Sequence, residues 1–140
     1  MRIVLAADGS PYTKKALAFL MTHESLAGPE DEILVVHAQP VLPPRVRAAV
    51  GADVVKSYQS DEAEKVLSPI RRFLDKHDVQ YQCEWSVGQA DEQILRAAKK
   101  SKAHLIVMGT HGHGLIGRVL MGSVAQKVVT GADVPVMLVK

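Results

Sequence analysis

Residues 3–11 read IVLAADGSP, an apolar run that stops at an acid, a glycine and a serine-proline pair. The run is short, partly β-branched and bounded by turn residues, which is typical of a strand. Ser10 and Pro11 then supply a hydroxyl at the N-cap and a proline at the first helical position. Apolar residues follow at helical spacing until Gly28 and Pro29 end the pattern. This stretch therefore predicts a strand that leads directly into a helix.

The same succession recurs along the chain. The predicted strands are 3–7, 33–38, 79–87, 105–108 and 134–139. Further helical patterns lie at about 53–77, 91–100 and 123–130, whereas 40–44 reads as a loop without periodicity. Pro69 falls inside the second helical pattern, so we expect a kink there or a restart with Ser68 as its cap.

Alternating strands and helices predict an α/β fold with a mainly parallel sheet. Three of the runs, 3–7, 33–38 and 105–108, are almost continuously apolar, as in strands covered on both faces. Residues 79–87 alternate between apolar and polar, and Pro135 opens the last run, so both are expected at sheet edges. We therefore expect an open, twisted five-stranded parallel sheet of order 3-2-1-4-5, with helices on both faces. Ligands bind such sheets at the carboxyl ends of strands 1 and 4, where the connections leave the two strands toward opposite sides of the sheet.

The composition sets the broad class of protein. Of the 140 residues, 47% are hydrophobic and 23% are charged, so we expect a single globular domain over residues 1–140. The net charge of +2 does not favour nucleic acid or an anionic membrane as a partner. Cys83 is the only cysteine, which excludes an intrachain disulfide and a thiolate metal cluster. The apolar runs are too short for a membrane span or a signal peptide, so the expected location is cytoplasmic.

The sixteen residues 109–124, GTHGHGLIGRVLMGSV, hold five glycines after the fourth predicted strand. A Walker A loop needs a lysine directly after its last glycine. Arg118 and Ser123 stand at the two positions where that lysine would be, so a Walker A loop is rejected. Gly112 to Gly117 match G-x-G-x-x-G, but that dinucleotide fingerprint belongs after the first strand of its fold.

A third spacing, G-x2-G-x9-G-S, fits the segment from Gly109 through Gly112 to Gly122 and Ser123. Gly109 would let the chain leave its strand with no side chain in the way of a ligand. Gly112 could take a positive φ and turn backbone N–H groups inward as an anion nest. Gly122 and Ser123 would open the last helix, whose N-terminus favours phosphate. The intervening residues would form a flap, to which His111, His113 and Arg118 add positive charge.

With this spacing the chain resembles the universal stress protein family in its ATP-binding subclass. The resemblance covers the whole length and is based on four segments taken together. They are IVLAADGS at 3–10, VVHA at 35–38, AHLIVMGTHG at 103–112 and GSV at 122–124. His104 departs from the family, which often has an acid before this strand, but it lies at the end of the strand far from the expected ligand.

The resemblance implies a Rossmann-like fold of the adenine nucleotide alpha hydrolase type, and a site for ATP with Mg²⁺ bridging the phosphates. Asp8 would hold the ribose, and the alternative from the residues alone is a cap for the turn before Ser10 and Pro11. The backbone of Ala38 would hold adenine, and Met108 would line the pocket. The phosphates would be held by Gly109, Gly112, Gly122, Ser123 and the backbone N–H of Val124. The family also implies a homodimer through the last strand.

The same residues argue against several other functions. Ala6 replaces the nucleophile of the D-x-D-G-[TS] phosphatase motif, and the chain has no G-x-S-x-G elbow for a hydrolase triad. His111 and His113 lack neighbouring carboxylates or thiolates for a metal site. We therefore expect a nucleotide-dependent sensor or regulator in stress adaptation, without efficient hydrolysis. The alternatives are a nucleotide hydrolase or transferase that uses the same pocket, and a family member that binds no nucleotide.

Overall fold

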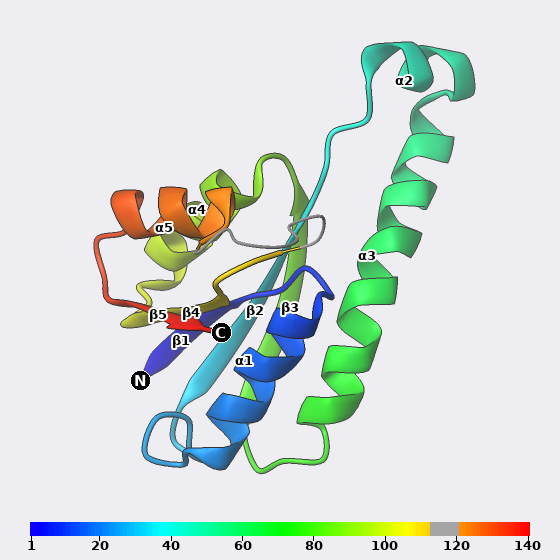
Figure 1. Cartoon of the computed structure of the whole chain (residues 1–140). Coiled ribbons are helices and arrows are strands. Elements are labelled where there is room, and N and C mark those ends of the chain that lie inside the picture. The colour runs from blue at the N-terminus through cyan, green and yellow to red at the C-terminus, as the bar shows by residue number, and fades with distance from the viewer. Residues whose placement is uncertain (113–120) are drawn as a thin grey trace.

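A computed structural model describes residues 1–112 and 121–140 of the chain (Figure 1). The sheet contains β1 (Arg2–Ala6), β2 (Glu32–Gln39), β3 (Gln80–Val87), β4 (Leu105–Gly109) and β5 (Val136–Val139). The helices are α1 (Pro11–Thr22), α2 (Pro44–Val50), α3 (Ala52–Leu74), α4 (Ala90–Ser101) and α5 (Ser123–Gly131). None of the helices in these two ranges is both long enough and apolar enough to span a membrane.

All the strand pairs are parallel, and their order is β3-β2-β1-β4-β5, as the sequence predicts. The central strand β1 pairs Ile3 with Ile33 of β2 on one side and with Leu105 of β4 on the other. Ile3, Val4 and Leu5 have no exposed surface, because helices cover both faces of the sheet at β1.

Two apolar layers separate the sheet from its helices. On one face, alternate residues of the strands pack with α1 and α3, and Leu20, Leu67 and Leu74 are fully buried there. On the other face, the intervening residues pack with α4 and α5, and Val4, Ile106 and Val128 are fully buried. The third strand is covered on the α3 face alone, where its odd residues, such as Cys83, pack. This explains the alternation that predicted an edge strand.

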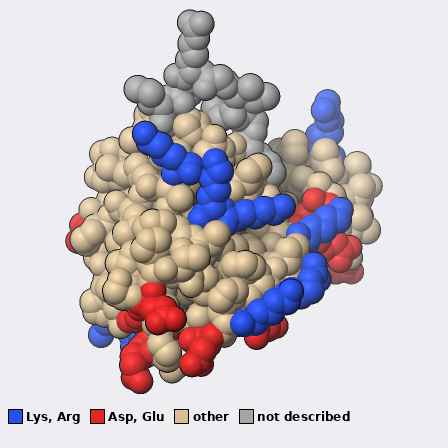
Figure 2. All heavy atoms as spheres, turned by 60° about the horizontal axis from the view of Figure 1, so that its bottom comes forward, with Lys and Arg blue, Asp and Glu red and all other residues tan. Residues whose placement is uncertain are grey.

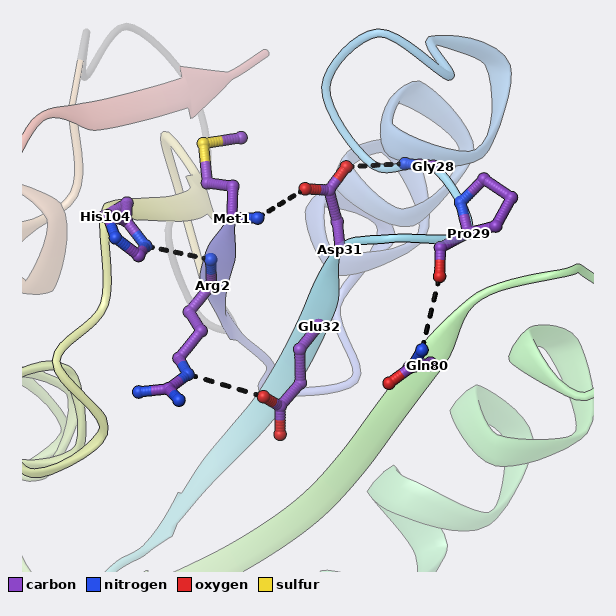
Figure 3. A network of polar contacts seen from close by, with 8 residues as sticks. All are labelled: Met1, Arg2, Gly28, Pro29, Asp31, Glu32, Gln80 and His104. Atoms are coloured by element: carbon purple, nitrogen blue, oxygen red, sulfur yellow. Dashed lines mark hydrogen bonds and ion pairs between the residues drawn. The ribbon is translucent and has the colours of Figure 1, made fainter.

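The amino-terminal ends of the strands are joined by polar contacts (Figure 3). The Asp31 carboxylate accepts hydrogen bonds from the Met1 amino group at 2.7 Å and from the Gly28 N–H at 2.8 Å. Arg2 reaches Glu32 at 3.5 Å, and its backbone N–H donates to Nδ1 of His104 at 3.0 Å. His104 therefore acts as a hydrogen-bond acceptor at the start of β4, at the end of the strand away from Gly109.

The structure differs from the sequence expectation in two helices. The predicted loop after β2 continues into α2, which begins at Pro44 and has no buried residue. The longest helix, α3, runs through Pro69 without a restart, because Leu67 and Ile70 are buried on either side of the proline. Ser68 is not a cap: its hydroxyl donates to Glu64 at 3.1 Å.

Candidate functional site

A cavity of about 380 Å³ opens at the carboxyl ends of β1, β2 and β4, beside the first turns of α4 and α5. Its volume is within the usual range of small-molecule sites, about 300–1,000 Å³. Its position is the switch point of the sheet, where the chain turns to opposite sides after β1 and β4. All eight predicted binding residues line it: Asp8, Ala38, Met108, Gly109, Gly112, Gly122, Ser123 and Val124.

Asp8 shapes the turn between β1 and α1. Its Oδ1 accepts hydrogen bonds from the Ser10 N–H and the Thr13 hydroxyl, both at 2.9 Å. The Asp8 N–H in turn donates to the Thr13 hydroxyl at 3.1 Å. Gly9 has a φ of 78°, which a glycine adopts without strain. The capping role of Asp8 is therefore present in the fold, and a role toward ribose stays a prediction for a residue that does line the cavity.

Ser10 is the N-cap residue of α1 by its backbone conformation, but its side chain makes no capping hydrogen bond to the helix. The residue is 1% exposed, and its hydroxyl makes no hydrogen bond among residues 1–112 and 121–140. The Asp8 carboxylate instead accepts a hydrogen bond from the N–H of Ser10 itself and so holds the turn before the helix, while no side chain of the described residues caps α1.

Gly112 lies against the Asp8 carboxylate. A Cβ placed on Gly112 would be 2.5 Å from Oδ2 of Asp8, closer than any carbon–oxygen contact allows. The φ of Gly112 is outside the left-handed region, so the predicted positive φ is wrong. The glycine is required by the close approach of the two segments.

Gly109 is required by a helix. A Cβ at this position would be 2.4 Å from Cβ of Tyr12 and 3.3 Å from its carbonyl carbon. The expectation that the missing side chain makes room for a ligand is therefore wrong, because α1 occupies that space. The Tyr12 ring also lies 5.1 Å from the ring of His111, whose Nδ1 is 2.9 Å from the Thr110 hydroxyl.

The N-terminus of α5 forms one wall of the cavity. Gly122 is the N-cap, with φ −70° and ψ 159°, and no side chain of the described residues caps the helix. The Gly122 N–H donates to the Thr110 carbonyl at 2.6 Å, and the first helical bond runs from the Gln126 N–H to the Gly122 carbonyl. The N–H groups of the first helical turn, which begins at Ser123, have no acceptor within the helix. They place the positive end of the helix dipole at the cavity.

Another part of the lining is apolar. It combines Val36 and Ala38 of β2 with Met108 of β4, and with Ala90 and Ile94 of α4. The two α4 residues were missed by sequence reasoning, although the topology carries a signal for them. A helix that follows edge strand β3 must cross back over the sheet to reach β4, and so begins near the carboxyl end of β2.

His37 supports this wall from behind. It is 6% exposed, and its Nδ1 lies 2.8 Å from the Ala7 carbonyl. A carbonyl can only accept, so Nδ1 carries the proton and donates. The other ring nitrogen is 2.9 Å from the side-chain oxygen of Gln39. His37 therefore joins β2 to the residue that precedes Asp8.

Part of the predicted site lies outside the described residues. This holds for the flap residues His113 and Arg118, and for Gly114 and Gly117. In the remainder of the chain, no three His, Cys, Asp or Glu side chains are grouped so as to hold a metal ion.

A second hollow of about 450 Å³ lies at the opposite end of the sheet, between β3 and α4. Its lining mixes Arg2, Lys100 and Lys102 with Glu32 and Glu84. Figure 2 turns the lower part of Figure 1 toward the viewer and shows acidic and basic side chains together on that face. The hollow has the larger volume, but it lies away from the switch point and has no glycine-rich segment. The first cavity is therefore the candidate site.

The fold is that of an open α/β protein with a cavity at the switch point of its sheet. The sequence model of the universal stress protein family matches residues 1–140. A universal stress protein of Thermus aquaticus is 36% identical over 140 residues, which cover 99% of this chain and 97% of that protein. The chain belongs to the universal stress protein family.

Solved structures agree on the fold. Protein MJ0577 of Methanocaldococcus jannaschii matches with a TM-score of 0.84 at 23% identity, over 99% of this chain and 94% of that chain. The universal stress protein of Archaeoglobus fulgidus, solved with dAMP, matches with a TM-score of 0.72 at 26% identity, over 100% and 98%. An Arabidopsis thaliana family member, solved with AMP, matches with a TM-score of 0.70 at 17% identity, over 100% and 91%.

Proposed function

We propose that this chain binds ATP at the switch-point cavity, with Mg²⁺ bridging the phosphates, and acts as a nucleotide-dependent sensor or regulator in stress adaptation. The observation that carries the proposal is the convergence of three features on one cavity. They are the carboxylate of Asp8, the glycine-rich end of β4, and the N-terminus of α5 without a side-chain cap.

Two parts of the cavity lining differ in polarity, as the base and the phosphates of a nucleotide do. The apolar wall around Ala38, Ile94 and Met108 suits the flat face of a base. The α5 wall offers backbone N–H groups and a positive dipole end to phosphate oxygens. Asp8 also lines the cavity, and a carboxylate can accept hydrogen bonds from ribose hydroxyls. The proteins from A. fulgidus and A. thaliana, solved with dAMP and AMP, support an adenine nucleotide as the ligand class.

Mg²⁺ would be held by the phosphates of ATP and not by a set of protein ligands. Asp8 is the only acidic residue among the described residues that line the cavity, whereas Mg²⁺ held by protein requires several oxygen ligands. When bound with ATP, Mg²⁺ would neutralise phosphate charge. The described lining residues include no lysine and no carboxylate besides Asp8, whose Oδ1 already holds the turn before α1, and His111 is the one imidazole among them. We therefore expect slow hydrolysis at most.

Binding is tested by thermal and chemical unfolding with and without Mg-ATP. A ligand at 100 times its Kd that binds only the native state stabilises it by about 2.7 kcal/mol. No shift in the unfolding midpoint, together with protein that purifies free of adenine nucleotide, would contradict the proposal. Mass spectrometry of ligand released from the purified protein identifies which nucleotide is preferred.

Two variants locate the ligand. Asp8→Asn keeps an oxygen for the Ser10 N–H and the Thr13 hydroxyl but replaces Oδ2 by a donor, so the turn should survive and affinity should fall. Gly122→Val should abolish binding while the fold persists, because φ −70° and ψ 159° are open to any residue. Unchanged affinity in both variants would place the ligand elsewhere. A turnover rate on the order of 1 s⁻¹ would favour the hydrolase or transferase alternative instead.

The proposal includes a homodimer through β5. This strand lies at a sheet edge, and unpaired edges accept another strand. The carbonyls of Pro135 and Val139 accept hydrogen bonds from β4, so alternation along the strand turns the N–H of Leu138 outward. Leu138→Pro removes that donor and leaves the β4 ladder intact, and so should retain the fold and lose the dimer. A wild-type monomer in light scattering at tens of micromolar would refute the dimer.

A further inference from the structure

The exposed apolar side chains gather on one projection of the molecule. Eight large hydrophobic residues are exposed in the described chain, and five of them lie between residues 41 and 58. They are Val41, Val46, Val50, Val54 and Tyr58, with exposed fractions from 37% to 56%. We call residues 41–58, which comprise α2 and the first two turns of α3, the arm. Such a concentration is unusual for the surface of a monomer and marks interaction surfaces.

The arm has little support from the rest of the chain. Figure 1 shows α2 and the upper part of α3 standing clear of the sheet and of the other helices. Not one residue of α2 is buried, and the helix is seven residues long. Isolated helices of this length are marginal in water, because the first turn costs more than its hydrogen bonds return. Apolar burial within a single copy therefore contributes little to the stability of α2.

The outward face of α3 changes character along its length. Val54, Tyr58 and Asp61 are spaced by four and three residues and lie on one face, and all three are exposed. The inward face carries Val55 and Gln59, which are both 8% exposed. The outward face is thus apolar within the arm and carries Asp61 one turn beyond it. The next residue on this face, Lys65, is exposed and has its own partner in Glu62 at 2.7 Å.

The opposite charge lies on α2, which precedes the apolar residues of α3 in the chain. Arg45 and Arg47 are exposed on α2, and neither makes an ion pair with any residue that the structure describes. Asp61 is also exposed and has no ion pair within that set. The surface therefore reads basic, apolar and acidic in order from α2 into α3. An antiparallel copy of this order brings each basic end opposite an acidic end.

We infer that the arm pairs with the arm of a second copy of this chain. The two α3 helices lie antiparallel about a two-fold axis midway between Val54 and Tyr58. Tyr58 of each copy then packs on Val54 of the other, and Asp61 lies about 7.5 Å along the helix from the axis, given the rise of about 1.5 Å per residue. That distance brings Asp61 opposite the junction of α2 and α3 in the second copy, within reach of its arginines. The contact is self-complementary, as a two-fold interface requires.

This interface is separate from the proposed β5 dimer. The third helix packs over β2 and β3, whereas β5 lies at the other edge of the sheet. Arm pairing and β5 pairing can therefore coexist, and a chain that uses both forms an assembly larger than a dimer, which closes as a tetramer only where the two two-fold axes meet at right angles. A chain that uses the arm alone forms a dimer.

Light scattering on matched variants tests the inference. Tyr58→Asp places a charge in the apolar centre, and Val129→Asp places one on α5 at a residue with a similar exposed fraction, 44% against 48%. Tyr58→Asp should halve the mass of the wild-type assembly at tens of micromolar, and Val129→Asp should leave the mass unchanged. Circular dichroism of both variants checks that the fold is retained. A wild-type mass that Tyr58→Asp does not change, or a mass that Val129→Asp alone reduces, overturns the inference.

Charge reversal tests the register. Arg47→Glu and Asp61→Arg should each weaken association, and the double variant should restore it, because the reversed charges meet again across the two-fold axis. Failure of the double variant to recover association overturns the antiparallel arrangement. Leu138→Pro distinguishes the two interfaces, since it should remove the β5 contact and leave the arm contact in place.

Discussion

The substitution Gly109→Ala tests the packing of α1 against the end of β4. The φ of Gly109 is accessible to alanine, so backbone strain is not at issue and the added methyl group decides the outcome. The new Cβ would be 2.4 Å from Cβ of Tyr12 and 3.2 Å from the His111 carbonyl oxygen. The Cβ of Tyr12 cannot rotate away, because it moves only with the helix backbone. Relief of the contact therefore requires displacement of the start of α1.

Such overpacking costs about 1–3 kcal/mol, and the loss of unfolded-state entropy on replacing glycine by alanine returns about 0.4–1 kcal/mol. We expect the free energy of unfolding to fall by about 1–2 kcal/mol and the melting temperature by about 3–8 °C for a chain of this size. The measurement is urea unfolding without nucleotide. An unchanged or increased free energy of unfolding would show that α1 and β4 are not in this contact.

A double-mutant cycle attributes the loss to one pair of atoms. Tyr12→Gly removes the opposing Cβ and should cancel part of the loss, with a coupling energy of about 1 kcal/mol. Tyr12→Ala keeps that Cβ and is the matched control, for which we expect little rescue. Equal rescue by the two variants would mean that the phenol ring, and not the helix backbone, conflicts with the methyl group.

Three further predictions concern the region under α3. The Tyr81 phenol donates to Asp75, which raises the pKa of Tyr81 to about 12, above the unfolded value of about 10. The stabilisation by this hydrogen bond is therefore full below pH 10 and is lost as the pH rises through 12. Absorbance titration of the wild type against Tyr81→Phe should show a phenol that ionises near pH 12 in the wild type alone. The absence of that ionisation step would exclude the hydrogen bond. Arg71 contacts both carboxylate oxygens of Glu64, at 2.6 and 3.2 Å, and this hydrogen bonding holds the pKa of Glu64 below its usual value. Because the pair is partly exposed, Arg71→Gln should cost at most about 1 kcal/mol at neutral pH in urea unfolding. That cost should vanish as the pH falls through the lowered pKa, and a cost that persists in acid would point to packing instead. Burial raises the pKa of the Cys83 thiol, so a disulfide reagent should modify it far more slowly in the native protein than in the unfolded chain, and equal rates would contradict its burial.

The sheet was predictable from the sequence because its determinants are local and strong. Strand burial on both faces requires a continuous apolar run, as at Ile3 to Leu5, and burial on one face requires alternation, as around Cys83. The position of the cavity followed from the same strand order, since the switch point is a property of the topology. Its lining by Asp8 and Gly122 then followed from their places directly after β1 and directly before α5.

Three features were beyond the sequence for physical reasons. The second helix has no buried face, so no apolar period distinguishes PRVRAAV from a loop. Pro69 predicts an interruption locally, but burial of residues on both sides of it keeps α3 continuous. Gly109 has the residue type that a ligand-binding loop would need, and only the three-dimensional packing shows that Tyr12 is what excludes a side chain there.

The Asp8 carboxylate lines the cavity, and one of its two oxygens also makes hydrogen bonds within the fold. Oδ1 holds the turn that starts α1, and Oδ2 faces the backbone of Gly112. Any molecule that contacts this carboxylate therefore also alters the strength of the bonds at Ser10 and Thr13. The backbone amide of Ser10 lies outside the cavity lining. Its rate of hydrogen exchange should therefore change when a ligand binds the Asp8 carboxylate in the cavity.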